Sequence, residues 1–282
     1  MIPIAIRIIT DSTCDLSKED QARLDIQVVP LTVQFSGISY LDGIEITNAQ
    51  FYDKLDQSQE LPTTSQVAPQ AFIEAFRAQM DAGHEVVGLF ISSEISGTYN
   101  SACTAKKALK SENIHVIDSR SATMGLALLV SEAAKMRDEG CGAKQIAEHI
   151  TTLTKKLRFI AAVNTLKYLR KGGRISAASA VVGEALGLKP IVAIMEGSIH
   201  AIGKARGMNL ALKSMLDRIL ADAPDVRYGV AFAHSCVPEL AEKAAALYKA
   251  PLGLTEWITC SIGSVIGTYA GRGAIGFAYI AK

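Results

Sequence analysis

Residues 85–102 read Glu85-Val86-Val87-Gly88-Leu89-Phe90-Ile91-Ser92-Ser93-Glu94-Ile95-Ser96-Gly97-Thr98-Tyr99-Asn100-Ser101-Ala102. An apolar run typical of a buried strand ends in hydroxyl side chains and a glycine, and a helix-forming sequence follows at once. Such a junction can bind an anion, because the first helical turn offers unpaired backbone N–H groups and the positive end of the helix dipole. The loop lacks the lysine of a P-loop and the spacing of a dinucleotide fingerprint. A simpler interpretation is that Ser96 only caps the helix.

Similar strand–loop–helix units lie on both sides of this junction. Repeated units of this kind predict a doubly wound, mostly parallel sheet, in which ligands bind at the carboxyl ends of the strands. Hydroxyl-rich segments at residues 11–13, 63–66, 92–98 and 118–121 fall at or near those ends. We predict strands over residues 4–10, 27–35, 86–91 and 114–117, helices over 16–23, 48–57, 70–82, 124–139 and 143–157 and from residue 99, a turn-rich segment over 37–43 and a loop over 61–69.

The pattern changes after residue 157. Strands and turns there follow one another with fewer intervening helices, which predicts antiparallel pairs in an α+β domain. We therefore predict a Rossmann-like α/β domain over residues 1–157 and an α+β domain with a mixed or antiparallel sheet over residues 158–282. In the second domain we expect strands over 159–163, 189–195, 199–204, 228–233, 257–261 and 277–280, helices over 166–169, 209–221 and 238–247, and a glycine-rich loop over 263–276.

Composition and charge exclude several classes of function. The formal charge is +1, from 29 basic and 28 acidic residues, which argues against a nucleic acid or an acidic membrane surface as the main partner. The five cysteines are dispersed and form no C-x-x-C pair, as expected for the reducing cytoplasm. The histidines are equally dispersed, so we expect no metal site. No apolar run approaches the roughly 20 residues of a membrane span, and Arg7 interrupts the apolar N-terminus, which indicates a buried strand rather than a signal sequence.

Six segments, in order along nearly the whole chain, resemble the DegV family. The resemblance implies a two-domain α/β protein that holds one long-chain fatty acid, such as palmitate, stearate or oleate, in a tunnel between its domains. It implies a non-catalytic carrier of the bacterial cytoplasm that presents the acyl carboxylate to a fatty-acid kinase, which makes an acyl phosphate for phospholipid synthesis. The fatty acid is the ligand, and no cofactor is implied. The segments are residues 9–16, 62–66, 91–99, 169–175, 187–191 and 263–268.

The resemblance also assigns residues. The family's carboxylate contacts correspond to Thr64 and Ser96, with Ser65, Gly97, Thr268 and Tyr269 beside them. Two hydroxyls and helix-start N–H groups could hold a buried carboxylate without a fixed cation. Arg206 corresponds to an arginine that docks the kinase; alternatively it is a solvated surface charge.

One segment departs from the family pattern. The family reads Gly-Thr-His-Thr-Gly-Pro-Gly where this chain reads Gly267-Thr268-Tyr269-Ala270-Gly271-Arg272-Gly273. Tyr269 thus replaces a histidine, and a phenol donates a hydrogen bond but carries no charge at pH 7. Arg272 replaces a proline and could add a cation to the head-group site.

Binding energy should come mainly from the acyl chain. About 14 methylenes at ~0.8 kcal/mol each outweigh neutral hydrogen bonds that contribute about 0.5–1.5 kcal/mol apiece. Residues 177–186 and 159–163 are the candidate tunnel walls, and ordinary core is the alternative for both. Two other functions stay open: binding of a small anion such as phosphate or a sugar phosphate, and a serine acyl hydrolase with Ser96 as nucleophile and His234 as base. Against the hydrolase, Glu94 stands where a G-x-S-x-G elbow has glycine.

Overall fold

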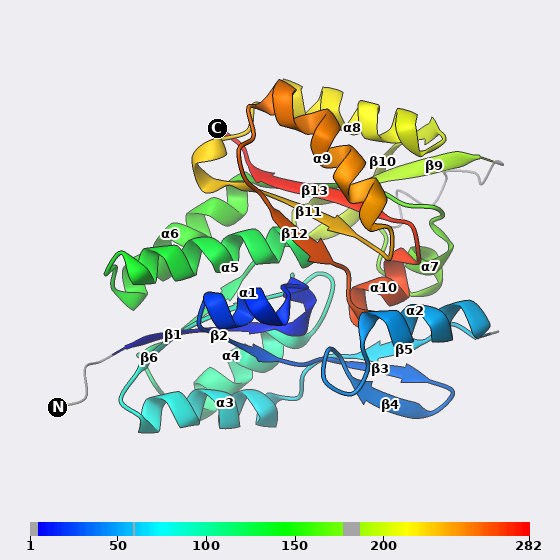
Figure 1. Ribbon diagram of the computed structural model, residues 1–282. Helices are drawn as coiled ribbons and strands as arrows, with labels where there is room; N and C mark the ends of the chain where they lie inside the picture. Colours follow the sequence, from blue (N-terminus) through cyan, green and yellow to red (C-terminus); the bar gives the residue numbers. More distant parts are fainter. Residues whose placement is uncertain (1–4, 59, 177–186) are drawn as a thin grey trace.

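The computed structural model describes residues 5–58, 60–176 and 187–282. Two β-sheets are stacked with helices between them and on both outer faces (Figure 1). The predicted class, a parallel α/β domain followed by an α+β domain, is confirmed. Among the described residues, no helix is both long and apolar enough to cross a bilayer.

The first sheet is wholly parallel and has the strand order β2-β1-β6-β7. Helices α3 and α4 pack on one face, and α5 and α6 on the other. Parallel strands are buried on both faces and are therefore nearly continuous in apolar residues, as β6 shows. The elements are β1 (Ile6–Asp11), α1 (Lys18–Arg23), β2 (Ile26–Val29), α3 (Pro69–Asp81), β6 (Glu85–Phe90), α4 (Thr98–Leu109), β7 (Ile114–Asp118), α5 (Thr123–Asp138) and α6 (Ala143–Lys156).

The second sheet is mixed and has the order β10-β9-β8-β13-β11-β12, with β11 and β12 as its parallel pair. Its outer face carries α8 and α9, and α5 packs on its inner face. Helix α5 is apolar nearly all round because it also contacts β1 and β6 of the first sheet. The elements are β8 (Leu157–Ala162), α7 (Lys167–Lys171), β9 (Leu188–Met195), β10 (Ser198–Arg206), α8 (Met208–Asp222), β11 (Val230–His234), α9 (Pro238–Leu252), β12 (Ile258–Ser261) and β13 (Ile275–Ile280).

Four local predictions were wrong. The strand predicted over residues 27–35 is two strands, β2 and β3 (Thr32–Phe35), which lie in different sheets. Residues 37–43 contain strand β4 (Ile38–Leu41), and residues 61–69 contain strand β5 (Thr63–Ser65). Both pair with β3 in a small antiparallel sheet, and β4 is too short and too exposed to show an apolar pattern. The glycine-rich loop contains helix α10 (Ser264–Ala270).

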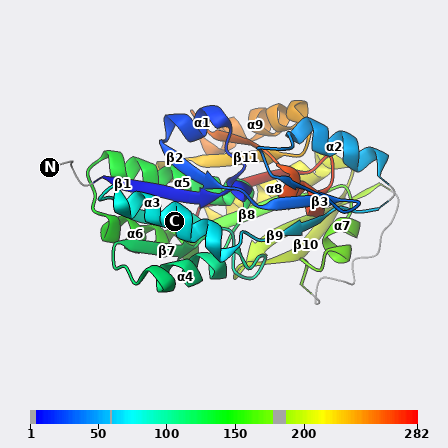
Figure 2. The same ribbon diagram turned by 90° about the horizontal axis from the view of Figure 1, so that it is seen from below.

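Close packing explains the glycine of α10. A Cβ on Gly267 would lie 2.6 Å from the ring of Phe51 and 2.8 Å from the hydroxyl of Tyr52, both on α2 (Asn48–Gln57). Glycine there reflects the approach of two helices rather than a loop. Seen from below, β3 and α2 lie at the same end of the molecule as β9, β10 and α7 (Figure 2).

The predicted domain boundary near residue 157 stays a prediction. The chain passes there from α6 to β8, the first strand of the second sheet. The largest hydrophobic cluster nevertheless includes residues of both sheets, such as Val87 and Ala278, because α5 lies between them.

Candidate functional site

A polar pocket forms where three segments far apart in the sequence meet. Strand β5 contributes Thr64, the loop between β6 and α4 contributes Ser96, and α10 contributes Tyr269. The hydroxyls of Thr64 and Tyr269 share a hydrogen bond of 2.6 Å. With Ser65 and Gly97 these residues line a cavity of about 280 Å³. The structure thus brings together five of the residues that the resemblance assigned.

Ser96 lies one residue before the N-cap position of α4, and its hydroxyl accepts a hydrogen bond from the first N–H group of the helix. Gly97 occupies the N-cap position and makes no side-chain cap. The Ser96 hydroxyl accepts a hydrogen bond from the Thr98 backbone N–H at 3.3 Å and lies 3.0 Å from the Thr98 hydroxyl. A Cβ on Gly97 would lie 1.9 Å from the side-chain oxygen of Gln66, so glycine lets the β5 segment approach the start of α4. Ser96 and Gly97, just before α4 begins, therefore line the polar pocket together with Gln66.

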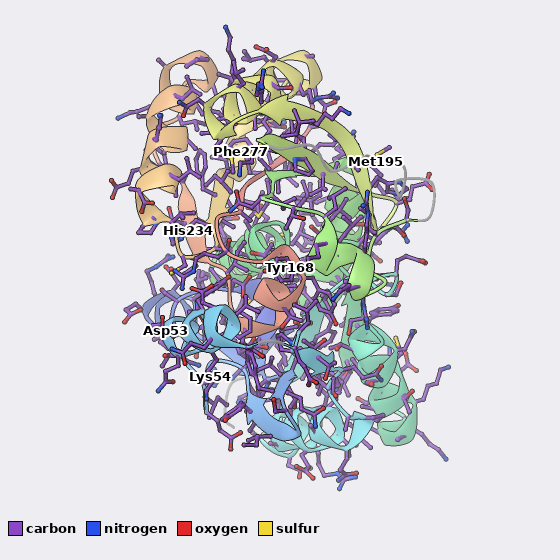
Figure 3. The ribbon with its side chains drawn as sticks, turned by 90° about the vertical axis from the view of Figure 1, so that its right-hand side faces the viewer. Asp53, Lys54, Tyr168, Met195, His234 and Phe277 are labelled. Atoms are coloured by element: carbon purple, nitrogen blue, oxygen red, sulfur yellow. The ribbon has the colours of Figure 1, made fainter. Side chains whose placement is uncertain are left out.

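Helix α10 supplies two of the assigned residues in different ways. Thr268 is buried and donates its hydroxyl proton in a hydrogen bond to the backbone oxygen of Ser264 at 2.8 Å. This proton is therefore used within the helix. Tyr269 is half-buried, and a Cβ on Gly172 would lie 2.4 Å from its ring. Both residues also line an adjoining surface pocket of about 530 Å³ with Tyr168 (labelled in Figure 3). Tyr269 is therefore the α10 residue that turns a donor towards the site.

Arg174 is the functional residue that sequence reasoning missed. It lines the polar pocket, the adjoining surface pocket and the apolar cavity behind them. Its guanidinium stacks over the Tyr269 ring at 5.0 Å and donates to the Gly172 oxygen at 2.6 Å. The sequence did hold a signal for Arg174, because it lies in residues 169–175, a basic segment interrupted by glycines. This segment is one of the six that resemble the DegV family. The site therefore has a cation at its entrance, contrary to the expected hydroxyl-only arrangement.

Arg272 does not reach the head-group pocket. Its guanidinium lies 3.0 Å from Asp56 and 3.9 Å from Asp53, both on α2, and 5.4 Å from the centre of the Tyr52 ring. It also donates to the Cys236 sulfur at 2.8 Å. Arg272, which was predicted to add a cation to the site, therefore connects α2 to the segment after α10 instead.

An apolar cavity continues inward from the polar pocket. Its volume is about 60 Å³, and Ile95, Ile266, Arg174 and Tyr269 line both spaces. Its walls come from the second sheet, from α10 and from the start of α5, and Ile95 of the loop after β6 completes them. Residues from the predicted wall 159–163 line it, whereas residues 177–186 lie outside the described part of the chain. The other lining residues are Ala122, Thr123, Met124, Phe159, Ala161, Val163, Leu169, Val192, Ile194, Ile199, Ile262, Ala270, Ala274, Ile275 and Gly276.

The two remaining candidates lie elsewhere. Arg206 is exposed at the end of β10, where it pairs in register with Leu188. His234, which is labelled in Figure 3, lines a separate cleft with Asp15 and Asp42. Ser96 and His234 therefore share no pocket, and the hydrolase arrangement is not assembled. Within residues 5–58, 60–176 and 187–282, no group of three or more His, Cys, Asp or Glu side chains is placed to hold a metal ion.

Comparison with known proteins identifies the family. The family model described as "Uncharacterised protein, DegV family" matches residues 5–282. The chain belongs to the DegV family. A DegV domain-containing protein of Clostridium perfringens is 39% identical over 213 residues, 76% of each chain. A DegV protein from Thermus thermophilus, described as fatty-acid binding, has 30% identity and a TM-score of 0.90 over 99% of this chain and 100% of its own. A stearic acid-binding protein from Eubacterium ventriosum has 28% identity and a TM-score of 0.87 over 98% of both chains.

Proposed function

We propose that this DegV protein binds one long-chain fatty acid, with the carboxylate in the polar pocket and the acyl chain in the apolar cavity behind it. The observation that carries the proposal is the continuity of the two spaces through Ile95, Ile266, Arg174 and Tyr269. A site for phosphate needs donors but no apolar extension. The fatty-acid binding of structural relatives supports the same assignment.

The hydroxyl pair suits a carboxylate. Thr64 and Tyr269 carry two protons, and one of them is used in the hydrogen bond between the two oxygens. The other can be donated to a carboxylate oxygen. Arg174 adds a positive charge beside Tyr269, and the hydroxyl of Ser96 lies in the same pocket. The carboxylate is then satisfied on several sides without the bidentate arginine contact that would hold it most tightly.

The acyl chain supplies most of the affinity in this proposal. Burial of about 14 methylenes contributes roughly 11 kcal/mol of favourable free energy. The loss of translational and rotational freedom on association opposes it by at least ~4 kcal/mol. The cavity of about 60 Å³ is well below the roughly 300–1,000 Å³ of typical ligand sites. Its aliphatic side chains must therefore move apart as the chain enters, and this reorganisation lowers the net affinity.

We further propose that the protein is a cytoplasmic, non-catalytic carrier that presents the carboxylate to a fatty-acid kinase, with Arg206 at the docking surface. The polar pocket adjoins the surface pocket beside Tyr168 and Lys171, so the carboxylate end is the one nearer to solvent. The kinase product would be an acyl phosphate that feeds phospholipid synthesis. The exposed position of Arg206 is compatible with docking.

Mass spectrometry of the purified protein tests the binding proposal. Native spectra followed by denaturation and organic extraction should show one adduct of fatty-acid mass per chain. A protein that carries no lipid and stays unshifted with added oleate and palmitate contradicts it. Thermal stabilisation by phosphate but not by fatty acid would then favour a small-anion protein.

A further inference from the structure

The N-terminus of α10 is held by two carboxylates from the N-terminal part of the chain. Gly263 N–H donates to Asp15 Oδ1 at 2.9 Å. Ser264 donates to Asp42 Oδ1 twice, from its backbone N–H at 3.0 Å and from its hydroxyl at 2.6 Å. Asp15 follows β1 and Asp42 follows β4, so the helix is fixed across more than 200 residues of sequence. Anionic acceptors at a helix N-terminus are favourable because they satisfy free N–H groups and the dipole.

Both carboxylates are buried at a cost in free energy. Asp15 is 9% exposed and Asp42 5% exposed, and none of the ion pairs among the described residues includes either of them. Burial raises the pKa of both groups, and the hydrogen bonds from Gly263 and Ser264 oppose that rise. Lys18 also favours the charged form of Asp42, but neither group forms an ion pair with a described residue, and a buried carboxyl group needs hydrogen-bond donors. The contacts with α10 therefore supply part of the hydrogen bonding of these side chains, and Thr123 and Ser12 contribute further for Asp15 and Asp42 respectively.

The packing leaves the start of α10 little freedom. A Cβ on Gly263 would lie 2.9 Å from Asp15 Oδ1 and 3.3 Å from Asp42 Oδ1. The preceding carbonyl, of Ile262, accepts a hydrogen bond from the hydroxyl of Tyr52 at 3.1 Å. The helix is seven residues long, and Tyr269 stands five residues, or about 7.5 Å, along it from Ser264. A displacement of the N-terminus therefore moves the Tyr269 hydroxyl by a similar distance.

We propose that Asp15 and Asp42 are positioning residues of the fatty-acid site, which hold α10 so that the Tyr269 hydroxyl stays within hydrogen-bonding distance of Thr64. The inference rests on the proposed function. The 2.6 Å bond between Thr64 and Tyr269 joins the small sheet to α10, and a shift of 1 Å at the helix would break it. Neither carboxylate is among the residues that line the polar pocket, so both act through the helix.

The test compares two ligands with the same chain, oleate and oleyl alcohol, in a displacement assay with the full-length protein. Asp42→Ala should lower the affinity for oleate about 3- to 10-fold, which corresponds to the loss of one or more hydrogen bonds. Its affinity for oleyl alcohol should change much less. Tyr269→Phe should give the same pattern. In the double variant the Asp42→Ala effect on oleate should disappear, because both changes remove the same contact. Asp42→Asn keeps an oxygen acceptor for Ser264 and should restore much of the affinity.

Several results would overturn the positioning role. They are an equal loss for oleate and oleyl alcohol, full additivity with Tyr269→Phe, or wild-type oleate affinity in folded Asp42→Ala. If Asp42→Ala fails to fold, Ser264→Ala removes the 2.6 Å bond alone and is expected to shift the ratio of oleate to alcohol affinity in the same direction. An unchanged ratio in that variant contradicts the inference. The proposed function fails separately, when the wild-type protein binds neither ligand.

Discussion

Replacing Ala161 with leucine should close the apolar cavity. Ala161 lies on β8, is 7% exposed and lines the cavity, with Gly276 of β13 and Val192 of β9 beside it in the sheet. Leucine adds three carbon atoms on this face and takes up the space of about three ligand methylenes. At ~0.8 kcal/mol per methylene the loss is about 2.4 kcal/mol, or roughly 60-fold in Kd.

Displacement of a fluorescent fatty-acid analogue by palmitate, stearate and oleate measures this loss. The penalty should fall equally on an acid and on the alcohol of the same chain, because the substitution touches the chain and not the carboxylate. That pattern separates Ala161→Leu from variants of the polar pocket.

Ala162 provides a matched control. It is the next residue on β8, is fully buried, and points to the opposite face of the sheet, where it packs in a different hydrophobic cluster. Ala162→Leu should lower the unfolding free energy by overpacking, typically about 1–3 kcal/mol, and leave Kd unchanged at temperatures where it is folded. A folded Ala161→Leu protein that binds oleate within about 3-fold of wild type would refute the assignment of this cavity to the acyl chain.

Four further predictions concern single side chains. Ser96→Ala should lower the affinity for oleate only about 3-fold, measured by calorimetry, because one neutral hydrogen bond is lost. A loss of affinity as large as that of Ala161→Leu would contradict the view that the acyl chain supplies most of the binding energy. Arg174→Gln should lower the affinity for oleate in low salt. Near 1 M salt, where charges are screened beyond about 3 Å, its affinity should match that of the wild type. A loss of affinity that does not depend on salt would indicate a packing role for Arg174 instead. Arg272→Gln should leave Kd unchanged and cost less than about 1 kcal/mol in urea unfolding, because its partner Asp56 is exposed. Burial raises the pKa of Asp11 to about 6, above its value in the unfolded chain. Its contribution to stability is therefore greatest below pH 4 and is lost as the pH rises through 6. Asp11→Asn should make the unfolding free energy, measured by denaturant titration, fall less over this pH range, and an unchanged fall would mean that other groups cause it.

The fold class could be predicted because its signals are local. Apolar runs that end in hydroxyls and glycine mark strand ends and helix starts, and the strand–loop–helix order at residues 85–102 recurs along the first half of the chain. Two of the misread segments depend on distant partners for their structure. Strand β5 pairs with β3, about 30 residues earlier, and α10 packs its Gly267 against α2. Strand β4 did have a local signal, the Ser36-Gly37 turn of its hairpin with β3, but its exposed residues show no apolar pattern.

The sequence by itself determined the family, the order of the elements and the segments that carry Thr64, Ser96 and Tyr269, because motifs and periodicity depend on adjacent residues. Only the tertiary structure decided which charges reach the site. Arg174 lies over Tyr269, although 95 residues separate them, whereas Arg272, three residues from Tyr269, turns to Asp56 on α2. The direction of a long side chain depends on the packing and charge that surround it in space, and those neighbours come from every part of the chain.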